Sequence, residues 1–91
     1  MGATNFFTKT LTDGTFTINS SDNVTKVSVI CRQGSIEYSG NGKFQGLSSE
    51  SITLEANQGV TLTASATSNP IDGLSITASG IGIAEIILST S

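Results

Sequence analysis

The stretch Val24-Thr-Lys-Val-Ser-Val-Ile-Cys-Arg-Gln-Gly-Ser-Ile-Glu-Tyr-Ser39 decides the fold class of this 91-residue chain. Apolar side chains occupy every second position on both sides of Gln33-Gly34, and successive side chains of a β-strand point to opposite faces. Two alternating runs joined by a short Gly-containing link predict a β-hairpin, which we place at the centre of a small all-β domain. The apolar positions are Val27, Val29 and Cys31 before the link and Ile36 and Tyr38 after it.

The rest of the chain repeats this pattern, with turn signals at intervals of about 8–12 residues, as in antiparallel sandwiches and barrels. We expect one domain over residues 1–91, with residues 1–4 as a flexible lead-in. Its predicted fold is an antiparallel β-sandwich, jelly-roll-like, with about eight short strands. One of these short strands is expected at Lys43–Gln45. The predicted core is Phe16, Ile18, Val27, Val29, Cys31, Ile36, Tyr38, Ile52, Leu54, Val60, Leu62, Leu74, Ile76, Ile86 and Leu88.

Charge is sparse: 12% of residues are charged and the net charge is −3, while 27 residues are Ser or Thr. Low charge with 36% hydrophobic residues argues against disorder. The four cations are scattered and too few to neutralise a nucleic-acid backbone, so we expect no nucleic-acid binding. The N-terminus lacks a signal peptide, and no apolar run approaches the ~20 residues of a membrane span. We therefore expect synthesis in a cytoplasm and no membrane association.

No catalytic or cofactor signature is present, and we expect no enzyme, no cofactor and no metal. The chain has no histidine, so Cys31, its one cysteine, lacks an imidazole to activate it and is expected to be a buried structural thiol. The carboxylates Asp13, Asp22 and Asp72 sit in predicted turns, where they satisfy local backbone donors. Ser20–Asn23 carries one charge, too few for a calcium loop.

The predicted edge strands show where another chain could bind. The runs Phe6–Leu11 and Ala84–Leu88 contain one Lys and one Glu between them and no proline, which leaves them poorly protected against strand pairing. Phe6 and Phe7 are adjacent, so a sandwich buries only one of them readily. A neighbouring chain covers the other, or a loop of the same domain does. The candidate subunit interface is Phe6, Phe7, Lys9 and Leu11.

From Val27 to Ala78 the chain resembles small structural proteins of tailed-bacteriophage virions. The resembling segments are Val27–Cys31, Gly34–Ile36, Leu47–Leu54, Gly59–Leu62 and Pro70–Ile76. The resemblance implies a homo-oligomeric capsid decoration, head-fibre or tail module, with a trimer favoured. Its partners would be other copies of itself and the major capsid protein or other virion proteins, and its location a virion assembled in the host cytoplasm. The alternative function is a small carbohydrate-binding or adhesion module; the alternative to self-association is a monomer whose own loops cover its edges.

Overall fold

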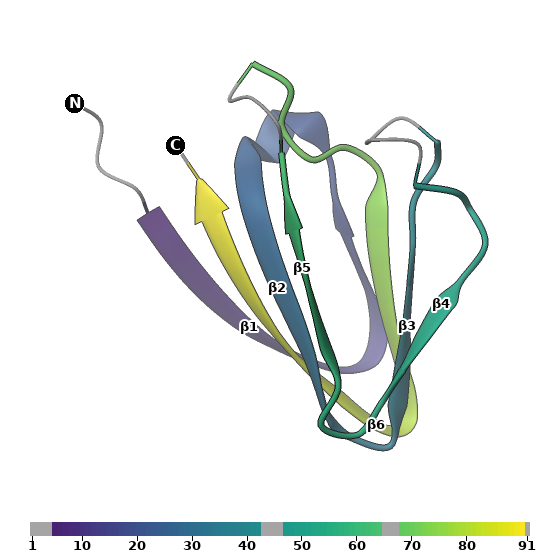
Figure 1. Cartoon of the computed structure of the whole chain (residues 1–91). Coiled ribbons are helices and arrows are strands. Elements are labelled where there is room, and N and C mark those ends of the chain that lie inside the picture. Colours follow the sequence, from purple (N-terminus) through teal and green to yellow (C-terminus); the bar gives the residue numbers. More distant parts are fainter. Residues whose placement is uncertain (1–4, 43–46, 65–67, 91) are drawn as a thin grey trace.

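The computed structural model describes residues 5–42, 47–64 and 68–90, and these form an all-β protein without an α-helix. The predicted all-β class and antiparallel pairing are confirmed. The strands form one curled sheet (Figure 1). The elements are β1 (Asn5–Ile18), a short 3-10 turn η1 (Ser20–Asp22), β2 (Val24–Gln33), β3 (Ser35–Ser39), β4 (Ile52–Glu55), β5 (Gly59–Thr63) and β6 (Leu74–Thr90).

The longest strand, β6, is the centre of the sheet. The strand order is β4-β3-β6-β2-β5, and β1 pairs along the other edge of β6. The first part of β6 pairs with β3 from Ser75 to Ala78, and the second part pairs with β2 from Ile83 to Thr90. β1 accompanies β6 through both parts, with a register shift between Thr12 and Gly14. The sheet therefore has two connected halves that share β6 and β1.

A fold line separates the two halves. Four strand paths cross it, namely β1, β2 followed by β3, β4 followed by β5, and β6, and each contains one residue in the left-handed region at the crossing. These residues are Asp13 (φ 46°), Gly34 (φ 64°), Asn57 (φ 71°) and Gly80 (φ 60°). Gly, Asn and Asp enter this region at lower cost than other residues, which explains their presence at the bends. Figure 1 shows the paths meeting at the fold line and separating away from it. We call the fold line the closed end and the opposite side the open end.

Two glycines allow the strands to approach closely at the closed end. A Cβ on Gly82 would lie 2.6 Å from the carbonyl oxygen of Ser35, and a Cβ on Gly34 would lie 3.2 Å from Cα of Gly82. The backbone of Cys31 also bonds to the neighbouring bend, since its N–H donates to Gln58 O and its carbonyl accepts from Asn57 N–H. Close backbone contacts therefore help to fix the closed end.

The predicted hairpin over Val24–Ser39 is wrong. β2 pairs with β5 and β6, and β3 pairs with β4 and β6, so β2 and β3 do not pair with each other. Gly34 bends one continuous path instead of reversing it, because a left-handed residue serves a strand corner as well as a tight turn. For the same reason, runs predicted as separate strands join into β1 and β6, and the described residues form six strands. The predicted strand Lys43–Gln45 lies outside the described residues.

Most of the predicted core is buried between the two halves, but Ile52 is 44% exposed. Ile52 begins the edge strand β4 and has a strand neighbour, Tyr38, on one side. Phe16, Val60, Leu62 and Leu88 are partly buried and pack against the core. Buried apolar residues that the prediction omitted are Leu11, Val24, Ile71, Ala78 and Ala84.

The prediction that Ala84–Leu88 forms an edge is also wrong. This run lies between β1 and β2, and it pairs with both. The run has apolar residues on both faces, with Ile86 buried and Ile87 exposed, and this fits a central strand. Its low charge had been interpreted as the sign of an unprotected edge. Phe6–Leu11 does lie at an edge, since β1 pairs with β6 and no other described strand pairs with it. The other edge strands are β4 and β5.

Candidate functional site: the β1 edge and its cleft

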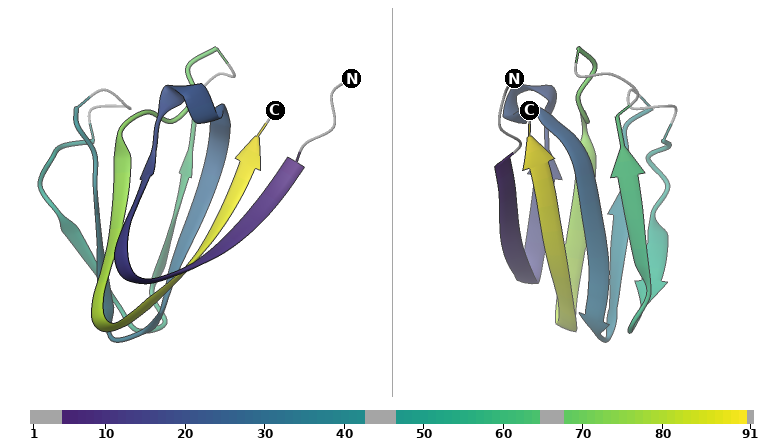
Figure 2. Two further views of the ribbon diagram at one scale, coloured as in Figure 1. Left: turned by 180° about the vertical axis from the view of Figure 1, so that it is seen from behind. Right: turned by 60° about the vertical axis from the view of Figure 1, so that its left-hand side comes forward.

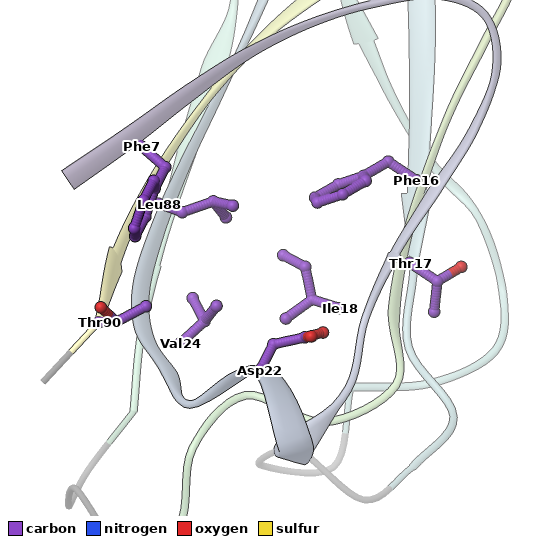
Figure 3. A pocket seen from close by; sticks show the side chains of 8 residues that line it. All are labelled: Phe7, Phe16, Thr17, Ile18, Asp22, Val24, Leu88 and Thr90. Atoms are coloured by element: carbon purple, nitrogen blue, oxygen red, sulfur yellow. The ribbon is translucent and has the colours of Figure 1, made fainter. Parts of the chain in front are cut away.

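An apolar cleft of about 230 Å³ opens between the two halves of the sheet beside β1. Phe7 and Leu88 come from one half, and Phe16 and Ile18 come from the other (Figure 3). Ile18 is fully buried, whereas the Phe7 side chain is 54% exposed. The volume is below the roughly 300–1,000 Å³ of typical small-molecule sites, and it suits a single side chain better than a cofactor. Its lining residues are Phe7, Phe16, Thr17, Ile18, Asp22, Val24, Leu88 and Thr90.

One charged residue lines this cleft, and a second contacts the Phe16 ring in its wall. Asp22 is the charged residue in its lining, and its Oδ2 accepts a hydrogen bond from the Asn19 N–H at 2.9 Å. Lys9 extends from the first half of β1, and its Nζ lies 5.4 Å from the centre of the Phe16 ring in the second half. A cation at this distance over an aromatic face is attracted by the ring quadrupole. Lys9 thus bridges the two halves at the exposed side of β1.

The four predicted interface residues occupy different environments along β1. Phe6 is 68% exposed on the convex face of the sheet, whereas Phe7 points toward the cleft. Lys9 is exposed and contacts Phe16. Leu11 is 7% exposed and belongs to the core. At Leu11 the side chain therefore stabilises the subunit itself, and exposed apolar surface is concentrated at Phe6 and Phe7.

The other candidate groups have local structural partners. Cys31 is buried, and its Sγ lies 3.4 Å from Gln33 O and 3.5 Å from Gly34 O. Asp72 Oδ1 accepts from the Ser20 N–H at 3.1 Å, which ties η1 to the segment before β6. Within residues 5–42, 47–64 and 68–90, no cluster of three metal-ligating side chains is present. The same ranges contain no helix long and apolar enough to cross a membrane.

Of the residues that line the cleft, Phe7 was predicted as a site residue and the others were not. Phe16 and Ile18 were expected in the core, and Asp22 was assigned to a turn. The sequence indicates both the alternation of Phe16 and Ile18 and a turn at Asp13, but not that this turn bends one continuous strand and brings the two residues toward Phe7. No local signal marks this long-range approach.

Comparisons of the chain with protein-family models, with curated proteins and with solved structures gave no match.

Proposed function

We propose that this protein is a non-enzymatic, self-associating structural subunit of a bacteriophage virion, as a capsid decoration or head-fibre protein. The observation that carries the proposal is the edge of β1, where Phe6 and Phe7 are exposed on opposite faces of one strand. A strand with an unpaired edge and exposed aromatic side chains favours association with another chain.

A jelly-roll fold, which is common among viral capsid proteins, is part of this proposal. The fold line divides each strand path into two arms, and we number the eight arms along the chain. Arms 1 and 2 are the two parts of β1, arms 3 to 6 are β2, β3, β4 and β5, and arms 7 and 8 are the two parts of β6. The pairings then give the orders 1-8-3-6 and 2-7-4-5 in the two halves. A jelly roll orders its eight strands in this way in its two sheets. The pairing pattern therefore supports the proposed sandwich, although each pair of arms here is continuous or nearly so.

The virion assignment is tested by mixing the purified protein with phage heads before and after expansion and measuring co-sedimentation. Stoichiometric binding to heads at saturation would support it. Absence of binding to heads and tails across a panel of tailed phages would count against the virion role, while leaving self-association to be measured by light scattering.

The exposed aromatic rings support one alternative, a carbohydrate-binding module. Sugar sites stack pyranose rings on aromatic faces, and Phe6 offers such a face. Reproducible binding to one sugar class on a glycan array, lost in Phe6→Ser, would favour this alternative over the virion role.

A further inference from the structure

We infer that two copies of this chain join their sheets through antiparallel pairing of β1 with β1, centred on Thr8. This inference rests on the self-association in the proposed function and specifies its geometry. A strand that pairs antiparallel with its own copy has twofold symmetry. The unit is therefore a dimer, in place of the trimer that the resemblance implies.

The backbone groups available on β1 follow from the hydrogen bonds of its neighbours. Cys31 N–H donates to Gln58 O at 2.9 Å, and Ala64 N–H donates to Thr25 O at 2.7 Å. Odd-numbered residues of β2 therefore bond toward β5. In an antiparallel sheet, the residues between them bond toward the strand on the other side. Even-numbered residues of β2, such as Ser28, thus bond to β6.

The same alternation continues across β6 to β1. Ser28 lies opposite Ile87, so odd-numbered residues in this part of β6 bond to β2 and even-numbered residues bond to β1. Leu88 lies opposite Phe7, and Ile86 lies opposite Lys9. Phe7 and Lys9 therefore complete the internal ladder. Phe6, Thr8 and Thr10 therefore direct their N–H and C=O groups to the unpaired edge, where they are available to pair with another strand.

The register of the pair follows from charge and side-chain chemistry. A pair centred on Thr8 uses the edge-facing backbone groups of all three residues, because Thr8 then lies opposite Thr8 and Phe6 lies opposite Thr10 of the second copy. It also places Lys9 of one copy opposite Phe7 of the other. Centring one residue further along would bring the two Lys9 side chains face to face, and like charges directly opposite each other are destabilising.

The cleft provides charge complementarity for this register. Phe7 lines the cleft together with the carboxylate of Asp22 (Figure 3). A second copy's Lys9, opposite Phe7, enters an apolar site with an aromatic ring and a negative charge. Lys9 already makes this kind of contact within one subunit, over Phe16. No acidic residue lies between Asn5 and Thr12, so this part of β1 has no carboxylate that could pair with a basic partner.

The first test is a pair of proline variants measured by light scattering at tens of micromolar. Thr8→Pro removes an N–H that the fold does not use, and proline is tolerated on the open side of an edge strand. We expect the mass to fall from twice 9.3 kDa to 9.3 kDa with unchanged β-type circular dichroism. The matched control is Thr61→Pro on the edge strand β5, whose N–H also points away from β2; this variant should stay dimeric. A dimeric, folded Thr8→Pro variant would overturn the inference.

The second test reports the register and does not depend on proline. Phe7→Cys and Lys9→Cys variants are oxidised separately and as a mixture, and the native Cys31 is buried. We expect a covalent dimer from the mixture and little from either variant alone, because residue 7 faces residue 9 of the second copy. Cross-linking of Lys9→Cys with itself, or no cross-linking in any sample, would overturn the inference. An oligomeric wild type with no cross-link would refute the β1 pairing alone, whereas a monomeric wild type would refute self-association as well.

Discussion

The closed and open ends of the folded sheet contain the same four strand paths, yet they differ in what holds them together. At the closed end, left-handed residues and glycines bring backbones into contact, and Ile36 and Cys31 are fully buried nearby. At the open end the halves separate, and Phe7 and Phe16 border a cleft (Figure 2, Figure 3). The comparison suggests that the closed end determines the fold of the subunit, whereas the open end retains apolar surface for a second chain.

The largest expected effect is on stability at the closed end. Ile36→Ala deletes a fully buried side chain, and we expect a loss of about 3–4 kcal/mol in the free energy of unfolding. Leu88→Ala at the open end should cost about 1–2 kcal/mol, because that side chain is already partly exposed. Urea denaturation followed by circular dichroism measures both. Equal losses would contradict the proposed difference between the ends.

The second-largest loss of stability is expected where the backbones approach closely at the fold line. Gly82→Ala places a Cβ against the Ser35 carbonyl, and we expect a loss of about 2–3 kcal/mol. Gly80→Ala is the matched control, since its Cβ meets open space and the cost is the left-handed conformation alone, about 1–2 kcal/mol. A Gly82→Ala variant as stable as the wild type would show that the bend is not fixed by this contact.

Exposed apolar residues at the two ends should behave differently in association. Phe6→Ser at the open end should shift the species from dimer to monomer while changing subunit stability by less than about 0.5 kcal/mol. Ile81→Ser at the closed end alters a similarly exposed residue, 72% against 68%, and should leave the mass unchanged. Light scattering compares them. Dissociation of the Ile81→Ser variant would indicate an interface at the closed end and would contradict the proposed interface at the open end.

The smallest effect is expected at the surface ion pair between Arg32 and Glu85. Both side chains are about half exposed, so water and salt screen their attraction. Glu85→Gln should change the unfolding free energy by about 0.5 kcal/mol or less, and less still in high salt. Denaturation at two salt concentrations checks this. A larger, salt-independent loss would indicate a structural role that exposure does not suggest.

The sequence predicted the strands well and their connections poorly. Alternation located Val27, Val29, Ile36 and Tyr38 in the core because side-chain period is a local property. Gly34 marked a change of direction correctly, but the sequence did not distinguish a hairpin reversal from a corner, since both use the left-handed region. Sparse charge and the lack of proline identified the edge at Phe6–Leu11, but the same criterion wrongly placed Ala84–Leu88 at an edge. The position of Phe7 in the fold depends on its pairing with Leu88 of β6, which is distant in the sequence and is marked by no local signal.

Amide hydrogen exchange along β1, measured at several protein concentrations, tests the β1 pairing most directly. Phe7, Lys9 and Leu11 should be protected at every concentration, because their N–H groups bond to β6 within the subunit. Phe6, Thr8 and Thr10 should exchange rapidly in dilute protein and become protected as concentration rises through the dimerisation range. Rapid exchange of these three amides at all concentrations, or their protection in dilute monomer, would contradict the account.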